Sequence, residues 1–272
     1  MFSIFRPFIF SLDPETAHDL AIHSLKFNVL PKNFFQVDNE ELLETNLFNE
    51  LLPNPIGLAA GFDKSAEVYN SLFKLGYGFV EVGTVTPERQ LGNPKPRIFR
   101  LEKDQALINR LGFNNHGSKV VSKRISENLP RGFLGINIGP NKDTKKKEED
   151  YYICLSQLFS YAGYLTINIS SPNTEGLRDF HEQNELDKLL MGINKIRREK
   201  NIVKPIAVKL SPDLNDAEIS KIIELIIKHK IDGIIVSNTT ERNRENLLDI
   251  QKNVIGGLSG QPLRNLSTNM IK

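Results

Sequence analysis

Short apolar runs alternate with amphipathic stretches along most of the chain. The apolar runs are rich in β-branched residues, which is typical of buried strands, and they cover 55–61, 79–86, 133–140, 164–169, 205–212 and 233–240. Between them, apolar positions at helical spacing predict helices over 66–75, 119–128, 149–161, 185–199 and 216–229. This alternation of strands and helices indicates a parallel sheet covered by helices.

Six strand–helix units can be counted in this pattern. They predict an α/β fold of the (β/α)₈ TIM-barrel type in which about six units are present, because the closed barrel has eight. After the sixth strand we expect a glycine-rich loop at 256–260 and a helix from about Pro262. On this interpretation the chain is a C-terminally shortened barrel, and its 272 residues suffice for one barrel-sized domain with a sizeable core.

A long excursion follows the second strand. Proline and glycine are dense over 87–96, and two strand-like runs at 97–101 and 106–110 flank a charged turn, which predicts a hairpin. A long loop in this position can cover a site. Before the first strand, the polar stretch 36–54 is interpreted as a linker or a short hairpin.

The first 35 residues differ from the rest in composition, because they hold seven of the sixteen phenylalanines. Asp13 as N-cap and Pro14 at the first helical position predict the start of a second helix. The apolar stretch before Asp13 is far too short for a membrane span, which needs about 20 residues. Two interpretations stand: a helical arm packed on the domain, slightly favoured by composition, or two amphipathic helices in a membrane interface. We therefore divide the chain into an arm, 1–38, and a barrel domain, 39–272.

Charge and cysteine content narrow the function classes. The net charge is +2 and no basic stripe is interleaved with aromatic residues, so we expect no nucleic-acid partner. The single cysteine, Cys154, excludes an internal disulfide and a paired-cysteine metal site. His18 and His23 are five residues apart, which is not a zinc-binding spacing on a helix, so we predict no metal.

Polar side chains gather at the ends of the predicted strands. A buried strand normally excludes such groups, since each must find a hydrogen-bond partner, and in a barrel of parallel strands these ends form the site-bearing face. The stretch 167–178 is the richest in such polar groups, with two hydroxyls and two carboxamides directly after a strand. A turn without a functional role would have a similar sequence. Because polar residues recur at the ends of several strands, the sequence predicts a flat, polar ligand. The residues expected to face this ligand are Asp63, Lys64, Thr84, Asn137, Asn168, Lys209, Ser237 and Asn238.

Six motifs in order along the whole chain carry a resemblance to a known family. They are Ala-Ala-Gly-Phe-Asp-Lys at 59–64, Glu-Val-Gly-Thr-Val-Thr-Pro at 81–87, Asn-Arg-Leu-Gly-Phe-Asn-Asn at 109–115, Asn-Ile-Gly at 137–139, Asn-Ile-Ser-Ser-Pro-Asn-Thr at 168–174 and Gly-Leu-Ser-Gly at 257–260. Together they resemble dihydroorotate dehydrogenase. The similarity is greatest to its quinone-dependent, membrane-associated class, because Ser171 stands where the soluble classes have a cysteine and the Phe-rich arm resembles that class's extension.

The resemblance implies a bound FMN and the oxidation of (S)-dihydroorotate to orotate. FMN would accept the hydride and a membrane quinone would be the final electron acceptor, in de novo pyrimidine (UMP) biosynthesis. Ser171 would be the catalytic base. The resemblance implies that substrate is bound by Lys64, Asn109, Arg110, Leu111, Gly112, Phe113, Asn168, Asn173, Asn238 and Thr239. It implies that FMN is bound by Ala60, Gly61, Phe62, Asp63, Lys64, Thr84, Asn137, Asn168, Lys209, Ser237 and Gly260.

The chemistry of these residues agrees with that assignment. Carboxamides offer a donor and an acceptor each, which suits the ring of orotate. Lys64 and Lys209 would stabilise negative charge on the reduced flavin, unless their tips extend to solvent. A serine is a poor base unaided, so we expect a relay through Thr174 and a water under Phe113.

The resemblance also sets the expected partners and two rival interpretations. We expect a monomer in peripheral contact with the cytoplasmic face of a bacterial membrane through residues 1–35. In such barrels the phosphate is usually bound after strands seven and eight, so the residues above would form a half-site. The rivals are a truncated, non-catalytic fragment and a soluble enzyme linked to fumarate or NAD.

Overall fold

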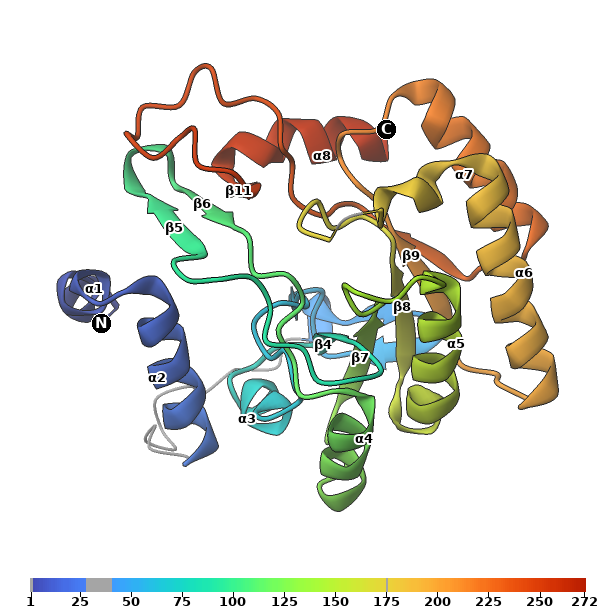
Figure 1. The fold of residues 1–272 in the computed structure, drawn as a ribbon. Helices are drawn as coiled ribbons and strands as arrows, with labels where there is room; N and C mark the ends of the chain where they lie inside the picture. The colour runs from blue at the N-terminus through green and yellow to red at the C-terminus, as the bar shows by residue number, and fades with distance from the viewer. Residues whose placement is uncertain (1, 28–40, 175) are drawn as a thin grey trace.

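A curled sheet of six parallel strands forms the centre of the molecule (Figure 1). A computed structural model describes residues 2–27, 41–174 and 176–272. The strand order is β10-β9-β8-β7-β4-β3, and every neighbouring pair is parallel. The predicted six strands are therefore confirmed as β3 (Gly57–Leu58), β4 (Phe79–Val85), β7 (Phe133–Ile138), β8 (Tyr164–Asn168), β9 (Ile206–Lys209) and β10 (Gly233–Ile235).

The register of these strands brings their polar ends together. Asn168, the last residue of β8, is paired with Lys209, the last residue of β9. Between β4 and β7 the register shifts after Val82, so that the end of β4 departs from regular pairing at Gly83 and Thr84. Because all strands run the same way, their carboxyl ends share one edge of the sheet.

Five helices follow the strands and pack against their outer side. The core between them is made of buried aliphatic residues such as Val82, Ile136, Leu155 and Leu189. Full burial of each such side chain contributes roughly 1.5–3 kcal/mol. The helices from α4 to α7 each contact the next one along the chain. They are α3 (Tyr69–Lys74), α4 (Ser118–Glu127), α5 (Lys147–Leu158), α6 (Gln183–Glu199) and α7 (Asp216–Lys228).

The predicted helices all exist, but two of their boundaries need correction. The helix expected from residue 66 begins only at Tyr69, because the Asp63 carboxylate accepts hydrogen bonds from the backbone N–H groups of Glu67 and Val68, both at 2.8 Å. Those bonds hold the preceding residues in a loop in which Ala66 has a positive φ. The helix expected over 149–161 starts at Lys147 and ends at Leu158, before a short 3₁₀ turn, η3 (Phe159–Tyr161).

A second, antiparallel sheet stands beside the first. The predicted hairpin is confirmed as β5 (Ile98–Leu101) and β6 (Ala106–Asn109), joined by η2 (Glu102–Asp104). The expected glycine-rich loop is wrong, since β11 (Gly257–Gly260) pairs along the whole of β6. Glycine is needed there for packing: a Cβ on Gly257 would stand 2.0 Å from Thr239 Oγ1.

The remaining elements connect or follow those described above. The segment 36–54 contains η1 (Glu41–Leu43) and a hairpin of β1 (Thr45–Leu47) and β2 (Glu50–Leu52), as one of the two interpretations expected. A 3₁₀ turn, η4 (Arg178–His181), precedes α6. After β11 come η5 (Gln261–Leu263) and α8 (Arg264–Ile271).

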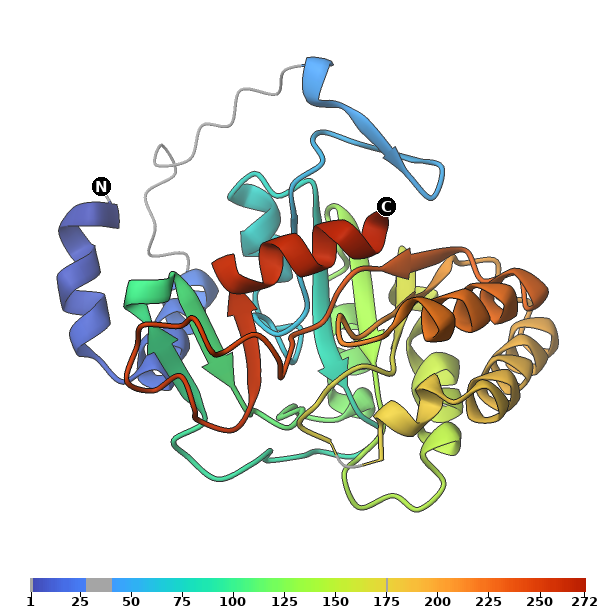
Figure 2. The same ribbon diagram turned by 90° about the horizontal axis from the view of Figure 1, so that it is seen from above.

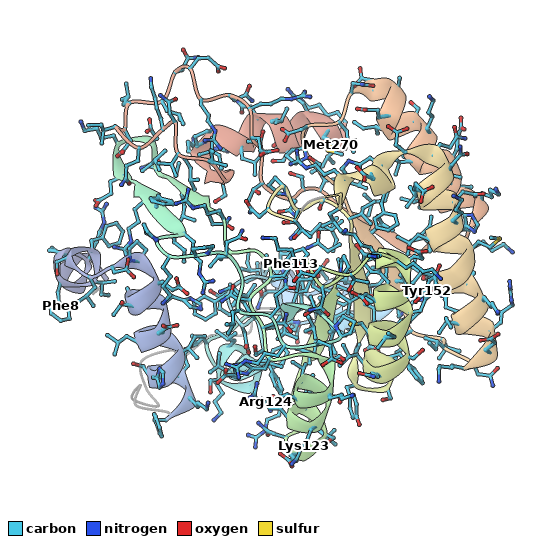
Figure 3. The ribbon with its side chains drawn as sticks, in the orientation of Figure 1. Phe8, Phe113, Lys123, Arg124, Tyr152 and Met270 are labelled. Carbon is cyan, nitrogen blue, oxygen red and sulfur yellow. The ribbon has the colours of Figure 1, made fainter. Side chains whose placement is uncertain are left out.

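The N-terminal arm consists of two helices, α1 (Phe2–Ser11) and α2 (Pro14–Lys26). Asp13 caps α2 as predicted, its Oδ1 accepting from the N–H groups of Glu15 and Thr16 at 3.0 Å. Figures 1 and 2 show the arm alongside the β5–β6 hairpin, on the side away from α6 and α7. Phe8 lies on the outer side of the arm (Figure 3) and is 64% exposed.

Parts of the arm fall outside the structural description. The predicted boundary at 38/39, and Phe34 and Phe35 within the arm, lie outside the described residues. Among the helices of residues 2–27, 41–174 and 176–272, none is long and apolar enough to cross a membrane.

Candidate active site

A cavity of about 650 Å³ lies between the carboxyl ends of the parallel strands, the antiparallel sheet and the arm. Most of the residues singled out in the sequence line it. Those that do are Ala60, Gly61, Phe62, Lys64, Thr84, Asn109, Leu111, Gly112, Phe113, Asn168, Ser171, Asn173, Lys209, Ser237, Asn238 and Thr239. Sequence reasoning thus located one contiguous site from segments that are far apart in the chain.

The loop after β3 leaves open space above its backbone. Gly61 has φ +114°, and no atom lies within 4 Å of the position that a Cβ would take. Its N–H donates to Gly83 O at 2.9 Å, while the Gly83 N–H donates to Asp63 O at 3.0 Å. The backbone is therefore held rigidly, and a planar ligand can approach it closely.

Two lysines, Lys64 and Lys209, line the cavity. Lys209 is 8% exposed, and within the described part of the chain neither its ammonium nor that of Lys64 donates a hydrogen bond to another residue. Burial lowers the pKa of Lys64 to about 8. A buried ammonium without a partner is costly, so this arrangement suits a ligand with negative charge or several acceptors. Burial of Lys209 excludes the alternative of a tip extending to solvent.

Four asparagines meet around the same end of the cavity. Asn168 Nδ2 donates to Thr84 Oγ1 at 3.0 Å, and its Oδ1 accepts from Asn238 Nδ2 at 3.3 Å. Asn173 Nδ2 donates to Asn109 O at 3.2 Å. These bonds fix the carboxamides of Asn168, Asn173 and Asn238 before any ligand arrives, which lowers the entropic cost of binding a flat polar ring.

Behind this wall lies a buried network that sequence reasoning missed. Asn137 is fully buried and does not line the cavity; it accepts from Thr84 Oγ1 at 2.7 Å and donates to Glu81 Oε1 at 2.8 Å. Glu81 Oε2 accepts from Tyr164 and Thr166 hydroxyls, both at 2.8 Å. The signal was available, because Glu81 is an acid in the middle of an apolar strand.

Ser171 occupies the loop after β8 and is 5% exposed. Its Oγ accepts a hydrogen bond from the Asn173 N–H at 3.2 Å. Within the described residues no hydrogen bond joins its hydroxyl to that of the buried Thr174, so the expected relay has no direct link between these two side chains. Phe113, with φ 53°, stands in the middle of the site region in Figure 3.

Three other predicted residues lie outside the cavity lining. Asp63 caps the loop before α3, as described above, and burial raises its pKa. Arg110 donates to Pro96 O at 2.9 Å and stacks over the Phe99 ring at 5.0 Å, so it braces the hairpin. Gly260 pairs with Ala106 in the antiparallel sheet.

The opposite end of the cavity is largely apolar and is built from the arm and the antiparallel sheet. Its lining residues include Ile9, Pro14, Ala17, Ile98, Leu107 and Leu263. Arg100 is the main polar group there; it donates to Leu12 O at 2.9 Å and lies 4.7 Å from the Phe10 ring centre. The cavity thus has a polar end at the strand ends and an apolar end beneath the arm.

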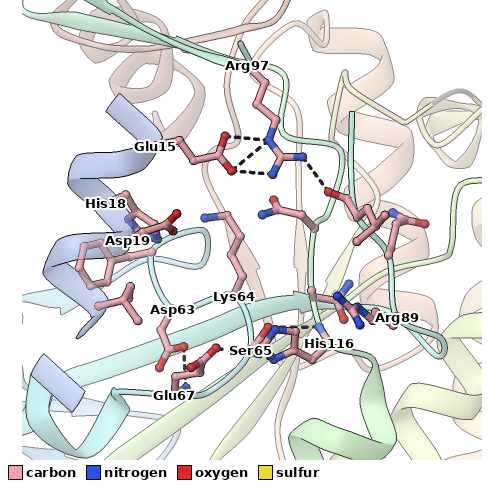
Figure 4. Close-up of a pocket in the computed structure, with 16 residues that line it drawn as sticks. Glu15, His18, Asp19, Asp63, Lys64, Ser65, Glu67, Arg89, Arg97 and His116 are labelled. Atoms are coloured by element: carbon pink, nitrogen blue, oxygen red, sulfur yellow. Dashed lines mark hydrogen bonds and ion pairs between the residues drawn. The ribbon is translucent and has the colours of Figure 1, made fainter. Parts of the chain in front are cut away.

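A smaller polar recess of about 240 Å³ adjoins the cavity (Figure 4). His18 and Lys64 belong to the walls of both. Burial, with the charge of Lys64 as a second cause, lowers the pKa of His18 to about 4. Arg97 crosses the recess to Glu15, at 2.6 Å between Nη2 and Oε1, and this buried ion pair attaches α2 to the hairpin.

Comparisons with known proteins agree with this geometry. The sequence profile of the family described as dihydroorotate dehydrogenase matches residues 42–272. The proteins named dihydroorotate dehydrogenase (quinone) of Idiomarina loihiensis and Bartonella tribocorum are 42% and 47% identical, over 100% and 97% of this chain and 83% and 73% of their own length. A crystal structure of DHODH from Eimeria tenella in complex with ferulenol, 39% identical, superposes with a TM-score of 0.89 over 95% of this chain and 75% of its own.

A parallel barrel sheet with a polar cavity at its carboxyl edge defines a TIM-barrel type of enzyme. Within that class, the family profile and the named relatives match most of the chain. The protein therefore belongs to the dihydroorotate dehydrogenase family. The ligand-free DHODH structure from Eimeria tenella, 40% identical with a TM-score of 0.88, shares the same fold over 95% of this chain and 78% of its own. The predicted fold class and family are confirmed.

Proposed function

We propose that the protein oxidises dihydroorotate to orotate, with FMN as hydride acceptor and a quinone as final electron acceptor, in pyrimidine biosynthesis. The relatives named dihydroorotate dehydrogenase (quinone) support this reaction. The observation that carries it is the two-ended cavity. Its polar end offers Lys64, Lys209 and four carboxamides to a charged ring system, and its apolar end offers a quinone an approach.

The residues at the polar end fit FMN. Ala60, Gly61 and Phe62 would lie along the flavin ring, where the backbone leaves open space. Lys64 and Lys209 would complement its negative charge, and Thr84, Asn168 and Ser237 would provide hydrogen bonds. When bound, FMN supplies a two-electron acceptor that the side chains of this protein lack. Asn137 would act by orienting Thr84.

The asparagines would hold the substrate. Asn109, Asn168, Asn173 and Asn238, with Thr239, present donors and acceptors that match the amides and carbonyls of the dihydroorotate ring. Ser171 would take the proton from the ring carbon next to the one that loses hydride. The Asn173 N–H on Ser171 Oγ orients the hydroxyl, and Thr174 with a water beneath Phe113 would carry the proton onward.

The arm would connect the site to the membrane. Ile9, Pro14 and Ala17 turn toward the cavity, whereas Phe8 and Leu20 are 64% and 51% exposed. Helices with one side on the protein and apolar residues on the other suit an interfacial position. We propose that residues 1–38 form a membrane-contacting unit, that 39–272 form the FMN-binding unit, and that the protein works as a monomer on the cytoplasmic face of a bacterial membrane.

One observation disfavours the soluble alternative. That class uses a cysteine base, but Cys154 is fully buried in α5 with its Sγ 3.7 Å from Val85 O, and it does not line the cavity. The burial also raises the pKa of this thiol well above its usual value.

The experiment begins with the absorbance spectrum of the purified protein, followed by anaerobic mixing with dihydroorotate. We expect flavin absorbance that bleaches with substrate and returns on adding a short-chain quinone, but not on adding fumarate or NAD. A colourless protein that does not take up FMN would contradict the proposal and favour the non-catalytic alternative. Reoxidation by fumarate or NAD would favour the soluble class.

A further inference from the structure

Three loops that follow β8, β9 and β10 converge on one carboxylate outside the cavity. Asp213, in the loop after β9, accepts at Oδ2 from Arg178 Nη2 at 3.2 Å and from the Glu241 N–H at 3.1 Å. Its Oδ1 accepts from the Thr240 hydroxyl. Arg178 also donates to Glu241 Oε2 at 2.9 Å. We refer to Arg178, Asp213, Thr240 and Glu241 as the loop clasp.

The interior of this clasp is shielded from water. Thr240 is fully buried, the Asp213 side chain is 8% exposed and that of Arg178 is 27% exposed. In such surroundings few water molecules compete for a charge-assisted hydrogen bond, and the bond is directional. Glu241 is the outer member, with a side chain 45% exposed, so its pairing with Arg178 contributes less.

Each loop in the clasp also carries residues of the cavity. The first loop holds Ser171 and Asn173, the second follows directly from Lys209, and the third holds Ser237, Asn238 and Thr239. On the cavity side, Asn238 Nδ2 donates to Ser170 Oγ at 3.0 Å. The first and third loops are therefore joined twice, once beside the cavity by Asn238 and once outside it by the clasp.

We propose that Asp213 and Arg178 are positioning residues for the oxidation of substrate, which rests on the function proposed above. Neither residue lines the cavity, so both act through the loops. The clasp sets the position of Ser171, on the first loop, relative to the substrate-holding Asn238 and Thr239, on the third. Proton removal needs the base within hydrogen-bond reach of the substrate, so a loosened first loop slows this step.

The test compares Asp213→Asn and Arg178→Gln with a matched control at the other end of the sheet. Arg197 donates to Asp232 at 3.0 Å, and Asp232 also accepts from the Ile206 N–H at 2.9 Å. Arg197→Gln therefore breaks a similar Arg–Asp bridge, but one that lies directly before β10, whereas the loop clasp lies after it. All proteins carry FMN and are compared by stopped-flow spectroscopy in two half-reactions: flavin reduction by dihydroorotate and reoxidation by a short-chain quinone.

We expect flavin reduction to slow on the order of 10²-fold in both clasp variants, since small misplacements of a reacting group cost that much. Reoxidation by quinone should stay within about twofold, and Arg197→Gln should change neither rate. Arg178→Lys should restore part of the loss because it keeps the charge. Reduction near the wild-type rate in both clasp variants, or an equal loss in Arg197→Gln, would overturn the proposal.

A second readout keeps the proposal testable if dihydroorotate does not reduce the wild-type flavin. In that case the proposed function fails, but amide hydrogen exchange still reports on the loop itself. Asp213→Asn should speed exchange at the backbone N–H groups of Ser170, Ser171, Asn173 and Thr174 at least tenfold while leaving α6 unchanged, because local opening governs exchange. Unchanged exchange in that loop would overturn the clasp in either case.

Discussion

The two ends of the cavity are built in different ways. At the polar end, side chains come from the ends of parallel strands and are held by neighbours, as Thr84 is held by Asn137 and Asn168. At the apolar end, the arm is attached to the hairpin region by the ion pairs of Glu15 with Arg97 and of Arg6 with Glu102, and by the bonds from Arg100 to Phe10 O and Leu12 O. The polar end, held by neighbouring side chains, suits chemistry that needs fixed geometry, and the apolar end, formed where the arm meets the antiparallel sheet, suits a partner that enters and leaves.

Replacing Ser171 by Ala should give the largest difference between the two ends, because it should impair the reaction at the polar end and leave the reaction at the apolar end unchanged. We expect dihydroorotate-driven flavin reduction to fall by roughly 10²–10⁴-fold, because general-base catalysis contributes that much. The FMN content and quinone reoxidation of the reduced protein should stay unchanged, since Ser171 supplies no charge to the flavin. Anaerobic stopped-flow measures both steps, and near-wild-type reduction by the variant would remove Ser171 from the role of base.

Lys209→Ala should weaken the polar end less severely. We expect FMN retention or the rate of its reduction to fall roughly tenfold, because about 1.4 kcal/mol of charge complementarity corresponds to that factor. Folding should be preserved, since the ammonium makes no hydrogen bond within the described residues. Flavin-to-protein ratio and reduction rate are the measurements, with exposed Lys195→Ala as control; unchanged values in both variants would leave Lys209 without a role toward the flavin.

Removing residues 1–35 should affect the apolar end alone. We expect the shortened protein to lose co-sedimentation with lipid vesicles and to reduce quinone at least several-fold more slowly, because its interfacial helices are gone. Reduction of a water-soluble dye should continue, as the polar end is intact. Vesicle binding that persists without the arm, or a protein that never binds vesicles at all, would contradict the proposed membrane contact.

The pH dependence of Lys64 should give the smallest effect. Its pKa of about 8 lies below the usual 10.5, so its positive charge is present below pH 8 and is lost above it. Orotate affinity should therefore fall several-fold as pH rises past 8, and Lys64→Gln should flatten that decline. The stability of the ligand-free protein changes in the opposite direction. Between pH 8 and 10.5 Lys64 is protonated in the unfolded chain but largely neutral in the folded one, so the free energy of unfolding should rise with pH.

These two effects can be read from one pH series. Titration of the flavin spectrum with orotate gives the affinity, and denaturant unfolding of the flavin-free protein gives the stability. An orotate affinity that stays level from pH 7 to 9.5, in wild type and variant alike, would show that Lys64 does not contact the anion.

The sequence predicts the polar end better than its surroundings, for a physical reason. Strand ends are marked locally by a change from β-branched to amide and hydroxyl residues, so Asn168 and Lys209 could be found from the pattern alone. Contacts between distant segments leave no such mark. Arg110 was expected at the substrate but braces Pro96 and Phe99, and Gly257 was expected in a loop but pairs with β6 against Thr239. The hairpin side of the apolar end was missed because Ile98 and Leu107 look like any other hairpin residues.

The pairing of β11 with β6 has a consequence for how the protein is assembled during synthesis. The Ser259 hydroxyl donates to Leu107 O, a residue 152 positions earlier in the chain. The arm precedes this sheet in the chain, and the sheet that supports it is completed only after β10 has been made. Contacts of such high sequence separation form late. Until then the apolar side of the nascent arm has no complete docking surface, so on the membrane contact proposed above a nearby lipid bilayer would receive it before the rest of the protein does.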